Sequence, residues 1–305
     1  MRLVVMGQQG FGKACLEAIL EKGKDKVVGV YCAPDLKEKP IDPIKEVAIE
    51  NNLPFYQPPN FKAEETVSQF LELKSDLCVM AYVTIFVPEK VRSIPRYGSI
   101  CFHPSLLPKH RGPSSINWPI ILGARKTGLS IFWPNDGLDE GEILLQKEVA
   151  IEPDDTLGDI YFGKIFPLGV EAILESIELI SQGNANKTPQ DHSQATYESW
   201  CRHEDAEINW SEPTEKIYNL IRGTNPQPGA WTTLDGAQLK IFDCALTKKY
   251  KGKPGEIVQI CSEGFVVSTF GEGILVKRVK PENEKKISAG EFAKRVNLKP
   301  GSSFM

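Results

Sequence analysis

Short apolar runs that alternate with helix-like patterns most constrain how this 305-residue chain can fold. Uninterrupted apolar runs are typical of strands buried on both faces, and parallel strands need a helix to connect them. The alternation therefore predicts an α/β domain with a Rossmann-like, doubly wound parallel sheet. The expected strands are 3–6, 27–32, 55–56, 77–82, 99–102 and 129–133, and the expected helices are 13–22, 43–51, 63–73 and 156–181.

After residue 182 the pattern changes. Residues 183–204 are polar and lack a clear period, which predicts a linker. A helical pattern at 213–222 follows, and short apolar segments at turn spacing then indicate a small β-barrel. We therefore predict a first domain at 1–182, a linker at 183–204 and a β-barrel domain at 205–305. The strand-like segments are 238–242, 256–260, 265–268 and 274–279.

Composition narrows the class of protein. The formal net charge is −4 and the isoelectric point is about 5.8, so no overall basic character indicates nucleic acid. No apolar run reaches the roughly 18 residues of a membrane span, and the first residues enter a strand pattern rather than a leader. The seven cysteines are scattered without a CxxC motif, which favours reduced thiols and a cytoplasmic location.

His103 and Asp139 are the main catalytic candidates. His103 ends the run at 99–102, and Asp139 lies in the acidic turn after the run at 129–133. Ligands of open α/β sheets bind at the carboxyl ends of strands, so two adjacent strand ends would bring the pair together. Imidazole moves protons near neutral pH, and a carboxylate orients it, which suits attack on a carbonyl group. The alternative is a structural histidine and a turn-capping aspartate.

Several motifs between residues 98 and 141 resemble one family when they are taken in order. These are His103-Pro-Ser-Leu-Leu-Pro108, Arg111-Gly112, Ile116-Asn117-Trp118 and Asp136-Gly-Leu-Asp139-x-Gly141. The stretch is similar to the formyltransferases that use 10-formyltetrahydrofolate. The likeness covers nearly the whole chain and is nearest to the hydrolase domain of 10-formyltetrahydrofolate dehydrogenase, with methionyl-tRNA formyltransferase more distant.

The resemblance implies a formyltransferase catalytic domain followed by an OB-like barrel. It implies that His103 and Asp139 are catalytic and that 10-formyltetrahydrofolate is the formyl donor, with tetrahydrofolate as product and no metal. Phe86 could instead be a core residue on its composition alone. The residues implied to contact folate are Ile85, Phe86, Val87, Ser105, Leu106, Leu107, Pro108 and Asp136.

Two cofactor alternatives remain open from the residues. Gly7, Gly10 and Gly12 follow a strand, and Asp35 lies about 20 positions further on, but the order GxxGxG differs from the dinucleotide fingerprint. The NADP-dependent domain of the resembled dehydrogenase is a separate one, so we expect no NAD(P). Cys201-x-His203 is a weak candidate for zinc, because a lone pair of ligands lacks metal-site spacing.

Two features of the sequence bear on the formyl acceptor. Transferring relatives carry an asparagine two residues before the histidine, whereas this chain has Cys101, and the loop at 35–40 is short and mixed in charge. Both features favour water or a small acceptor. Residues 206–305 nevertheless hold 15 Lys+Arg against 11 Asp+Glu, with lysines at 248, 249, 251 and 253, so tRNA stays possible.

Four hypotheses therefore stand, and nothing in the sequence indicates an oligomeric state. They are a 10-formyltetrahydrofolate hydrolase or small-acceptor enzyme, a methionyl-tRNA formyltransferase, a sugar-amine formyltransferase and a folate-binding protein without catalysis.

Overall fold

The computed structural model describes residues 1–37, 40–248, 250 and 252–304. This part of the chain forms two compact units. Unit 1 comprises Met1–Arg111, Gly128–Glu148 and Lys164–Tyr197, and unit 2 comprises Gly112–Thr127, Val149–Gly163 and Glu198–Met305. Each unit draws on several parts of the sequence, so the predicted boundaries at 182 and 205 stay predictions. The loop at 35–40 and the lysine group at 248–253 lie partly outside the described residues.

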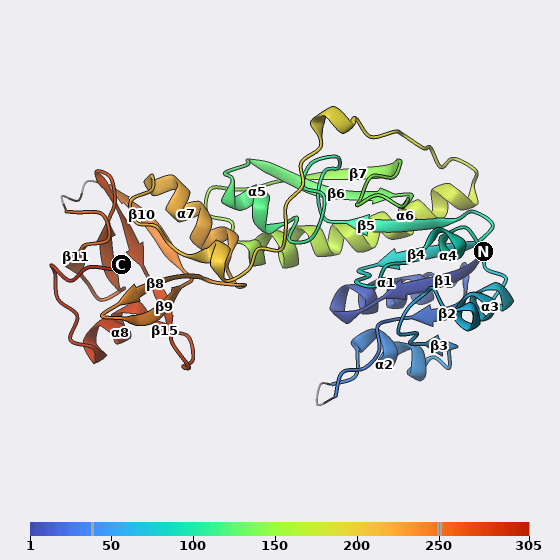
Figure 1. The fold of residues 1–305 in the computed structure, drawn as a ribbon, viewed down its shortest axis with the longest axis horizontal. Helices are drawn as coiled ribbons and strands as arrows, with labels where there is room; N and C mark the ends of the chain where they lie inside the picture. Colours follow the sequence, from blue (N-terminus) through green and yellow to red (C-terminus); the bar gives the residue numbers. More distant parts are fainter. Residues whose placement is uncertain (38–39, 249, 251, 305) are drawn as a thin grey trace. The chain divides into compact units, whose positions relative to one another are not determined.

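Within the described residues, unit 1 is built on a seven-stranded sheet with the order β3-β2-β1-β4-β5-β6-β7 (Figure 1). Neighbours from β3 to β5 run parallel, whereas β6 is antiparallel to β5. The strands are β1 (Arg2–Gly7), β2 (Lys26–Tyr31), β3 (Phe55–Tyr56), β4 (Leu77–Ala81), β5 (Ser99–His103), β6 (Lys126–Phe132) and β7 (Ile143–Ala150).

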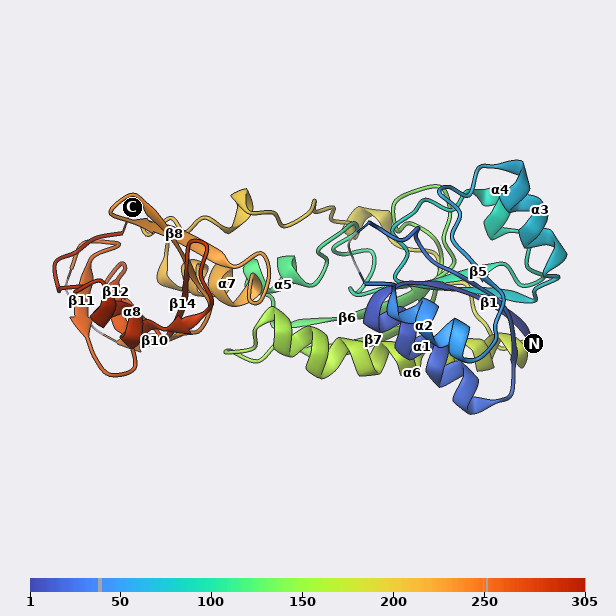
Figure 2. The same ribbon diagram turned by 90° about the horizontal axis from the view of Figure 1, so that it is seen from below.

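Helices lie on both faces of this sheet. Figure 2 shows α1, α2 and α6 on one side of the strands and α3 and α4 on the other. Helix α1 packs against α2 and α6, while α3 contacts α4. This cover on both faces confirms the predicted doubly wound α/β fold, to which β6 adds an antiparallel strand. The helices are α1 (Gln9–Lys22), α2 (Pro43–Glu50), α3 (Glu64–Glu72), α4 (Glu89–Arg92) and α6 (Phe166–Ser181).

Close backbone packing explains two of the early glycines. A Cβ atom on Gly7 would lie 2.5 Å from the carbonyl oxygen of Ala81, and one on Gly12 would lie 3.0 Å from the carbonyl carbon of Gly7. Gly10 differs, because the nearest atom to its Cβ position is a ring carbon of Phe166 at 3.9 Å. Gly7 and Gly12 therefore let the start of α1 approach β1 and β4.

The predicted helix at 156–181 begins as expected but is not uniform. The Asp159 carboxylate accepts from the backbone N–H of Thr156 at 2.9 Å, and the Thr156 hydroxyl accepts from the backbone N–H of Asp159 at 3.2 Å. This reciprocal pair resembles a capping box. The segment Asp159–Ile165 is π-helical and leads into α6. Pro167 lies at the start of α6 and cannot donate a backbone hydrogen bond, which accounts for the change of helix type there.

Unit 2 contains two antiparallel four-stranded sheets in the described residues, with the orders β10-β13-β12-β11 and β15-β14-β9-β8. Both sheets contribute to one apolar core. This confirms a small β domain. The predicted strand at 274–279 is wrong as a single element, because β13 and β14 belong to different sheets. The strands are β8 (Ala230–Leu234), β9 (Ala237–Ile241), β10 (Cys244–Lys248), β11 (Ile257–Ile260), β12 (Phe265–Ser268), β13 (Glu272–Val276), β14 (Arg278–Pro281) and β15 (Ile287–Ser288).

The helices of unit 2 are short. The Asn117 side chain donates to the carbonyl oxygen of Gly223 at 2.9 Å, which joins α5 to the end of α7.

None of the helices in the described ranges is long and apolar enough to cross a membrane. The helices are α5 (Asn117–Ile121), α7 (Thr214–Gly223) and α8 (Ala289–Arg295), with a 3₁₀ turn at Glu204–Ala206; a second 3₁₀ turn, His192–Gln194, belongs to unit 1.

We expect Gly7→Ala to lower the free energy of unfolding by about 1–3 kcal/mol, because the added methyl group meets backbone rather than a movable side chain. Gly10→Ala is the matched control and should be stabilising by about 0.4–1 kcal/mol, since alanine restricts the unfolded chain. Urea denaturation of both variants measures the difference. Equal effects would contradict the packing role of Gly7.

Candidate active site

Strand β5 places His103 at its carboxyl end, with 6% of the residue exposed. The Nε2 atom lies 2.8 Å from the carbonyl oxygen of His110. A carbonyl oxygen only accepts hydrogen bonds, so Nε2 must carry the proton in this contact. The Nδ1 atom then faces the carboxylate of Asp139, with 3.6 Å between Nδ1 and Oδ2. The structure thus brings the two predicted catalytic residues together.

The route by which Asp139 arrives differs from the prediction. Because β6 is antiparallel to β5, its last residue, Phe132, pairs with Cys101 and not with His103. The expectation of two carboxyl strand ends side by side is therefore wrong. The loop after β6 instead doubles back, and a Cβ atom on Gly141 would lie 1.7 Å from the carbonyl oxygen of Trp133. Asp139 itself adopts a φ of 55° in this returning loop.

Cys101 lies near the same pair. Alternate residues of a strand point to the same side, so Cys101 shares a face of β5 with His103. Burial raises the pKa of the Cys101 thiol well above its usual value, and the charge of Asp139 raises that pKa further. The thiol therefore stays protonated and uncharged beside the carboxylate.

The predicted folate contacts at 85–87 have different surroundings. Val87 is 5% exposed and belongs to a buried apolar cluster, against which Ile85 packs. Phe86 is 58% exposed, so the alternative that it is a core residue is wrong. The ring of Phe86 lies 6.0 Å from the Lys62 ammonium nitrogen. Of these three side chains, Phe86 is the most exposed and therefore the most accessible to a ligand.

The segment from Ser105 to Pro108 is held against β6. The Ser130 hydroxyl donates to the carbonyl oxygen of Ser105 at 2.7 Å and accepts from the backbone N–H of Leu107 at 3.1 Å. Ser105 and Leu107 are buried, whereas Leu106 and Pro108 are partly exposed. The first two therefore fix the segment, and the other two remain accessible for a ligand.

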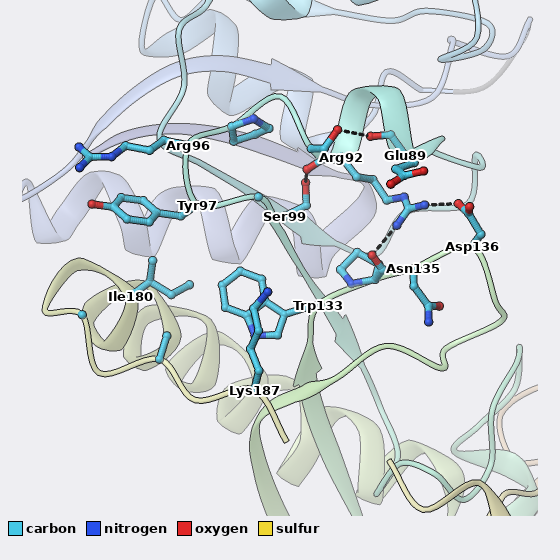
Figure 3. A pocket seen from close by; sticks show the side chains of 16 residues that line it. Glu89, Arg92, Arg96, Tyr97, Ser99, Trp133, Asn135, Asp136, Ile180 and Lys187 are labelled. Atoms are coloured by element: carbon cyan, nitrogen blue, oxygen red, sulfur yellow. Dashed lines mark hydrogen bonds and ion pairs between the residues drawn. The ribbon is translucent and has the colours of Figure 1, made fainter. Parts of the chain in front are cut away.

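Asp136 lies away from His103. Its carboxylate pairs with the guanidinium of Arg92, and both line a cavity of about 720 Å³ beside Ser99, the first residue of β5 (Figure 3). His103 ends the same strand and is not part of the cavity lining. The structure therefore separates Asp136 from the pair formed by His103 and Asp139.

Two residues to which the sequence assigned no role hold the Asp139 loop. Arg111 is fully buried and donates to the side-chain oxygen of Gln190 from Nε and Nη2, at 3.2 and 2.7 Å. The Gln190 amide nitrogen donates to the carbonyl oxygens of Asp139 and Gly141, at 2.8 and 2.7 Å. Gln190 falls in the predicted linker, where neither periodicity nor a motif singles it out.

The zinc candidate has other contacts in unit 2. The ring of His203 stacks on Trp231 with 4.7 Å between centroids, and its Nε2 lies 3.1 Å from the Gln238 amide. Within the described ranges of the chain, no three His, Cys, Asp or Glu side chains lie together in a way that could hold a metal ion. His203 therefore has a packing role in this unit.

The glycine turn after β1 lacks a feature of dinucleotide sites. Gly7 and Gly12 occupy the outer positions of a GxGxxG pattern, but Gln9 stands where the second glycine lets backbone approach a pyrophosphate. The backbone N–H of Gln9 donates to the carboxylate of Asp42, at 2.8 and 3.0 Å from its two oxygens. A protein carboxylate thus already occupies the anion position at the start of α1.

Comparison with known proteins identifies the family of this chain. Residues 1–170 match the family described as Formyl transferase, and residues 201–297 match the family described as Formyl transferase, C-terminal domain. The chain belongs to the formyl transferase family.

Individual relatives differ in their reactions. The cytosolic 10-formyltetrahydrofolate dehydrogenase of Xenopus laevis is 37% identical over 96% of this chain, which spans only 34% of that protein. The methionyl-tRNA formyltransferase of Clostridioides difficile (strain 630) is 33% identical over 99% of both chains. A solved structure of WlaRD, a sugar 3N-formyl transferase in the presence of dTDP and 5-N-formyl-THF, shares the fold at 18% identity, with a TM-score of 0.69 over 93% of this chain and 99% of that one.

We expect neither NAD⁺ nor NADP⁺ to bind, because Gln9 and the Asp42 carboxylate occupy the turn that would receive a pyrophosphate. Calorimetric titration of the purified protein with each dinucleotide should give no heat of binding. A dissociation constant in the micromolar range would contradict this expectation.

Proposed function

We propose that this protein uses 10-formyltetrahydrofolate as a formyl donor and that its acceptor is water or a small molecule. Membership of the formyl transferase family supports formyl chemistry. The folate-dependent relatives and the formyl-folate described with WlaRD support the donor. The chain spans about 34% of the length of the dehydrogenases that it matches, so the proposal concerns formyl release alone and not their full reaction.

His103 would stabilise the transition state through Nδ1. Nε2 is occupied by the carbonyl oxygen of His110, so Nδ1 is the ring nitrogen left to face a substrate. The Nδ1 atom lies 3.6 Å from the Asp139 carboxylate, which is longer than a good hydrogen bond. An N–H group there can donate to the oxyanion that forms on the formyl oxygen, an interaction commonly worth about 3–4 kcal/mol.

Asp139 would act as the general base. The oxygen of water attacks the formyl carbon while the carboxylate takes one proton from that water. The tetrahedral intermediate then collapses, the bond from the formyl carbon to N10 breaks, and N10 takes a proton from the imidazolium. The products are tetrahydrofolate and formic acid, which ionises to formate in water, and the proton on Asp139 passes to His103 to restore the starting state of the pair. This sequence needs neither a metal nor an oxidant.

The side chain of Cys101 supports water or a small molecule as the proposed acceptor. The family resemblance implies an asparagine at this position in transferring members, whose amide would orient an amine next to the oxyanion. A protonated thiol is a weak donor and cannot replace that amide. A thiol at this position therefore favours water over an amine that an amide would have to hold.

Formylation of Met-tRNA is the second candidate. The methionyl-tRNA formyltransferase of Clostridioides difficile matches this chain over 99% of the length of both proteins. Residues 206–305 also carry more Lys+Arg than Asp+Glu. Binding through such charges would weaken steeply with salt. The alternative of a sugar-amine acceptor is supported only by the fold that this chain shares with WlaRD.

We expect His103→Ala and Asp139→Ala each to lower turnover of 10-formyltetrahydrofolate by about a hundredfold or more, the scale of a lost general acid or base. Release of tetrahydrofolate measures the rate. Asp235→Ala is the matched control, because Asp235 is an exposed turn residue of unit 2. A folded His103 or Asp139 variant with nearly normal turnover would remove that residue from the mechanism.

We expect the protein to release formate from 10-formyltetrahydrofolate without RNA and to formylate Met-tRNA poorly. Both assays use the same protein, donor concentration and low-salt buffer. Cys101→Asn is measured beside the wild type and should hydrolyse more slowly, because the amide displaces the attacking water. Efficient formylation of Met-tRNA without hydrolysis would replace the water acceptor with tRNA. Binding of folate with no turnover in either assay would indicate a binding protein.

A further inference from the structure

The pair formed by His103 and Asp139 depends on two loops that both need external support. One loop brings the carbonyl oxygen of His110 to Nε2 of His103, and the other carries Asp139. His110 and Asp139 both have positive φ angles, 58° and 55°, which side chains other than glycine adopt at a cost in backbone strain. Contacts from elsewhere must therefore keep each loop in place.

Residues 188–197, which we call the strap, contact both loops. Within unit 1, the strap follows α6 and passes beside β7 (Figure 1). At its start, Thr188 and Ile143 exchange backbone hydrogen bonds of 2.8 and 2.9 Å just after the Asp139 loop. Two residues further on, Gln190 donates to the carbonyl oxygens of Asp139 and Gly141.

The end of the strap holds the loop of His110. The Thr196 hydroxyl accepts from the backbone N–H of His110 at 2.9 Å, and its carbonyl oxygen accepts from the N–H of Arg111 at 3.0 Å. The backbone N–H of Thr196 donates to the carbonyl oxygen of Pro108 at 3.3 Å. Thr196 thus fixes the segment whose carbonyl group orients the imidazole of His103.

Arg111 fixes which way the Gln190 amide points. Its buried guanidinium only donates hydrogen bonds, so the oxygen of the amide must face it and the nitrogen must face the Asp139 loop. Arg111 also forms an ion pair with Glu140 at 3.5 Å and donates a hydrogen bond to the Tyr197 hydroxyl. That hydroxyl in turn donates to the Glu140 carboxylate at 2.6 Å. One buried cation therefore joins the strap to the residue that follows Asp139.

We propose that Gln190 and Thr196 are positioning residues and that the strap sets the spacing between His103 and Asp139. The inference rests on the proposed function of that pair. Neither side chain needs to touch the substrate: Gln190 holds the base, and Thr196 holds the group that orients the acid. The polar segment between the predicted domains is thus part of the catalytic apparatus.

The test compares Gln190→Glu and Gln190→Leu with Gln194→Leu. Glutamate keeps the size of the side chain and its contact with Arg111 but cannot donate to the two carbonyl oxygens. Gln194 is exposed on the same strap and provides the matched control. We expect both Gln190 variants to lower kcat at least about thirtyfold with KM changed less than about threefold, because small misplacements of catalytic groups are costly. Gln194→Leu should retain wild-type kcat.

Hydrogen exchange supplies a measurement that does not depend on activity. Amides at 133–142 should exchange faster in Gln190→Glu than in the wild type or Gln194→Leu. If the wild type has no hydrolytic activity, the proposed function fails while this exchange experiment still tests the strap. Wild-type kcat together with wild-type exchange in Gln190→Glu would overturn the proposal.

Thr196 provides a second pair of variants should the Gln190 substitutions prevent folding. Thr196→Val removes the hydroxyl that accepts from His110, whereas Thr196→Ser keeps it. We expect valine to lower kcat at least about tenfold and serine to restore it, on the same positional argument. Equal kcat values for valine, serine and the wild type would overturn the role of Thr196.

Discussion

The hydrogen bond from Nε2 of His103 to the carbonyl oxygen of His110 is the contact on which the candidate site depends. It assigns one proton to Nε2 and leaves Nδ1 to face Asp139. Without it the imidazole could present either nitrogen in either protonation state. Because the acceptor is a backbone carbonyl group, the orientation of the ring is as secure as the loop that carries His110, and that loop is held by Thr196.

Local sequence patterns predicted the parts of the fold that depend on burial and periodicity. The two-residue strand at Phe55–Tyr56 and the strand at Phe265–Ser268 were located to the residue. The patterns could not give strand direction: an apolar run reads the same in either orientation, so the antiparallel pairing of β6 was not foreseen. They also merged β13 and β14, since only tertiary packing assigns these two strands to different sheets.

The candidate site was predictable where a motif carries it and not where long-range contacts do. His103 and Asp139 stand in motifs, and the structure brings them together although the expected route was wrong. Gln190 lies 51 residues from Asp139 and 79 from Arg111, in a polar segment without periodicity. Its amide meets all of its partners through tertiary structure, so composition could only describe the segment as a linker.

This fold fixes some features of the candidate site and leaves others to single residues. A doubly wound sheet supplies strand ends and a helix start, but each of these can be used for binding or filled by the protein itself. At the start of α1 the Asp42 carboxylate accepts from the backbone N–H of Gln9 and fills the anion position. The turn after β1 therefore has a structural role, although its glycines resemble those of a dinucleotide site. At β5 the uncharged thiol of Cys101 shares a face of the strand with His103. The fold therefore fixes where such positions lie, whereas single side chains such as Asp42 and Cys101 fix which groups those positions present.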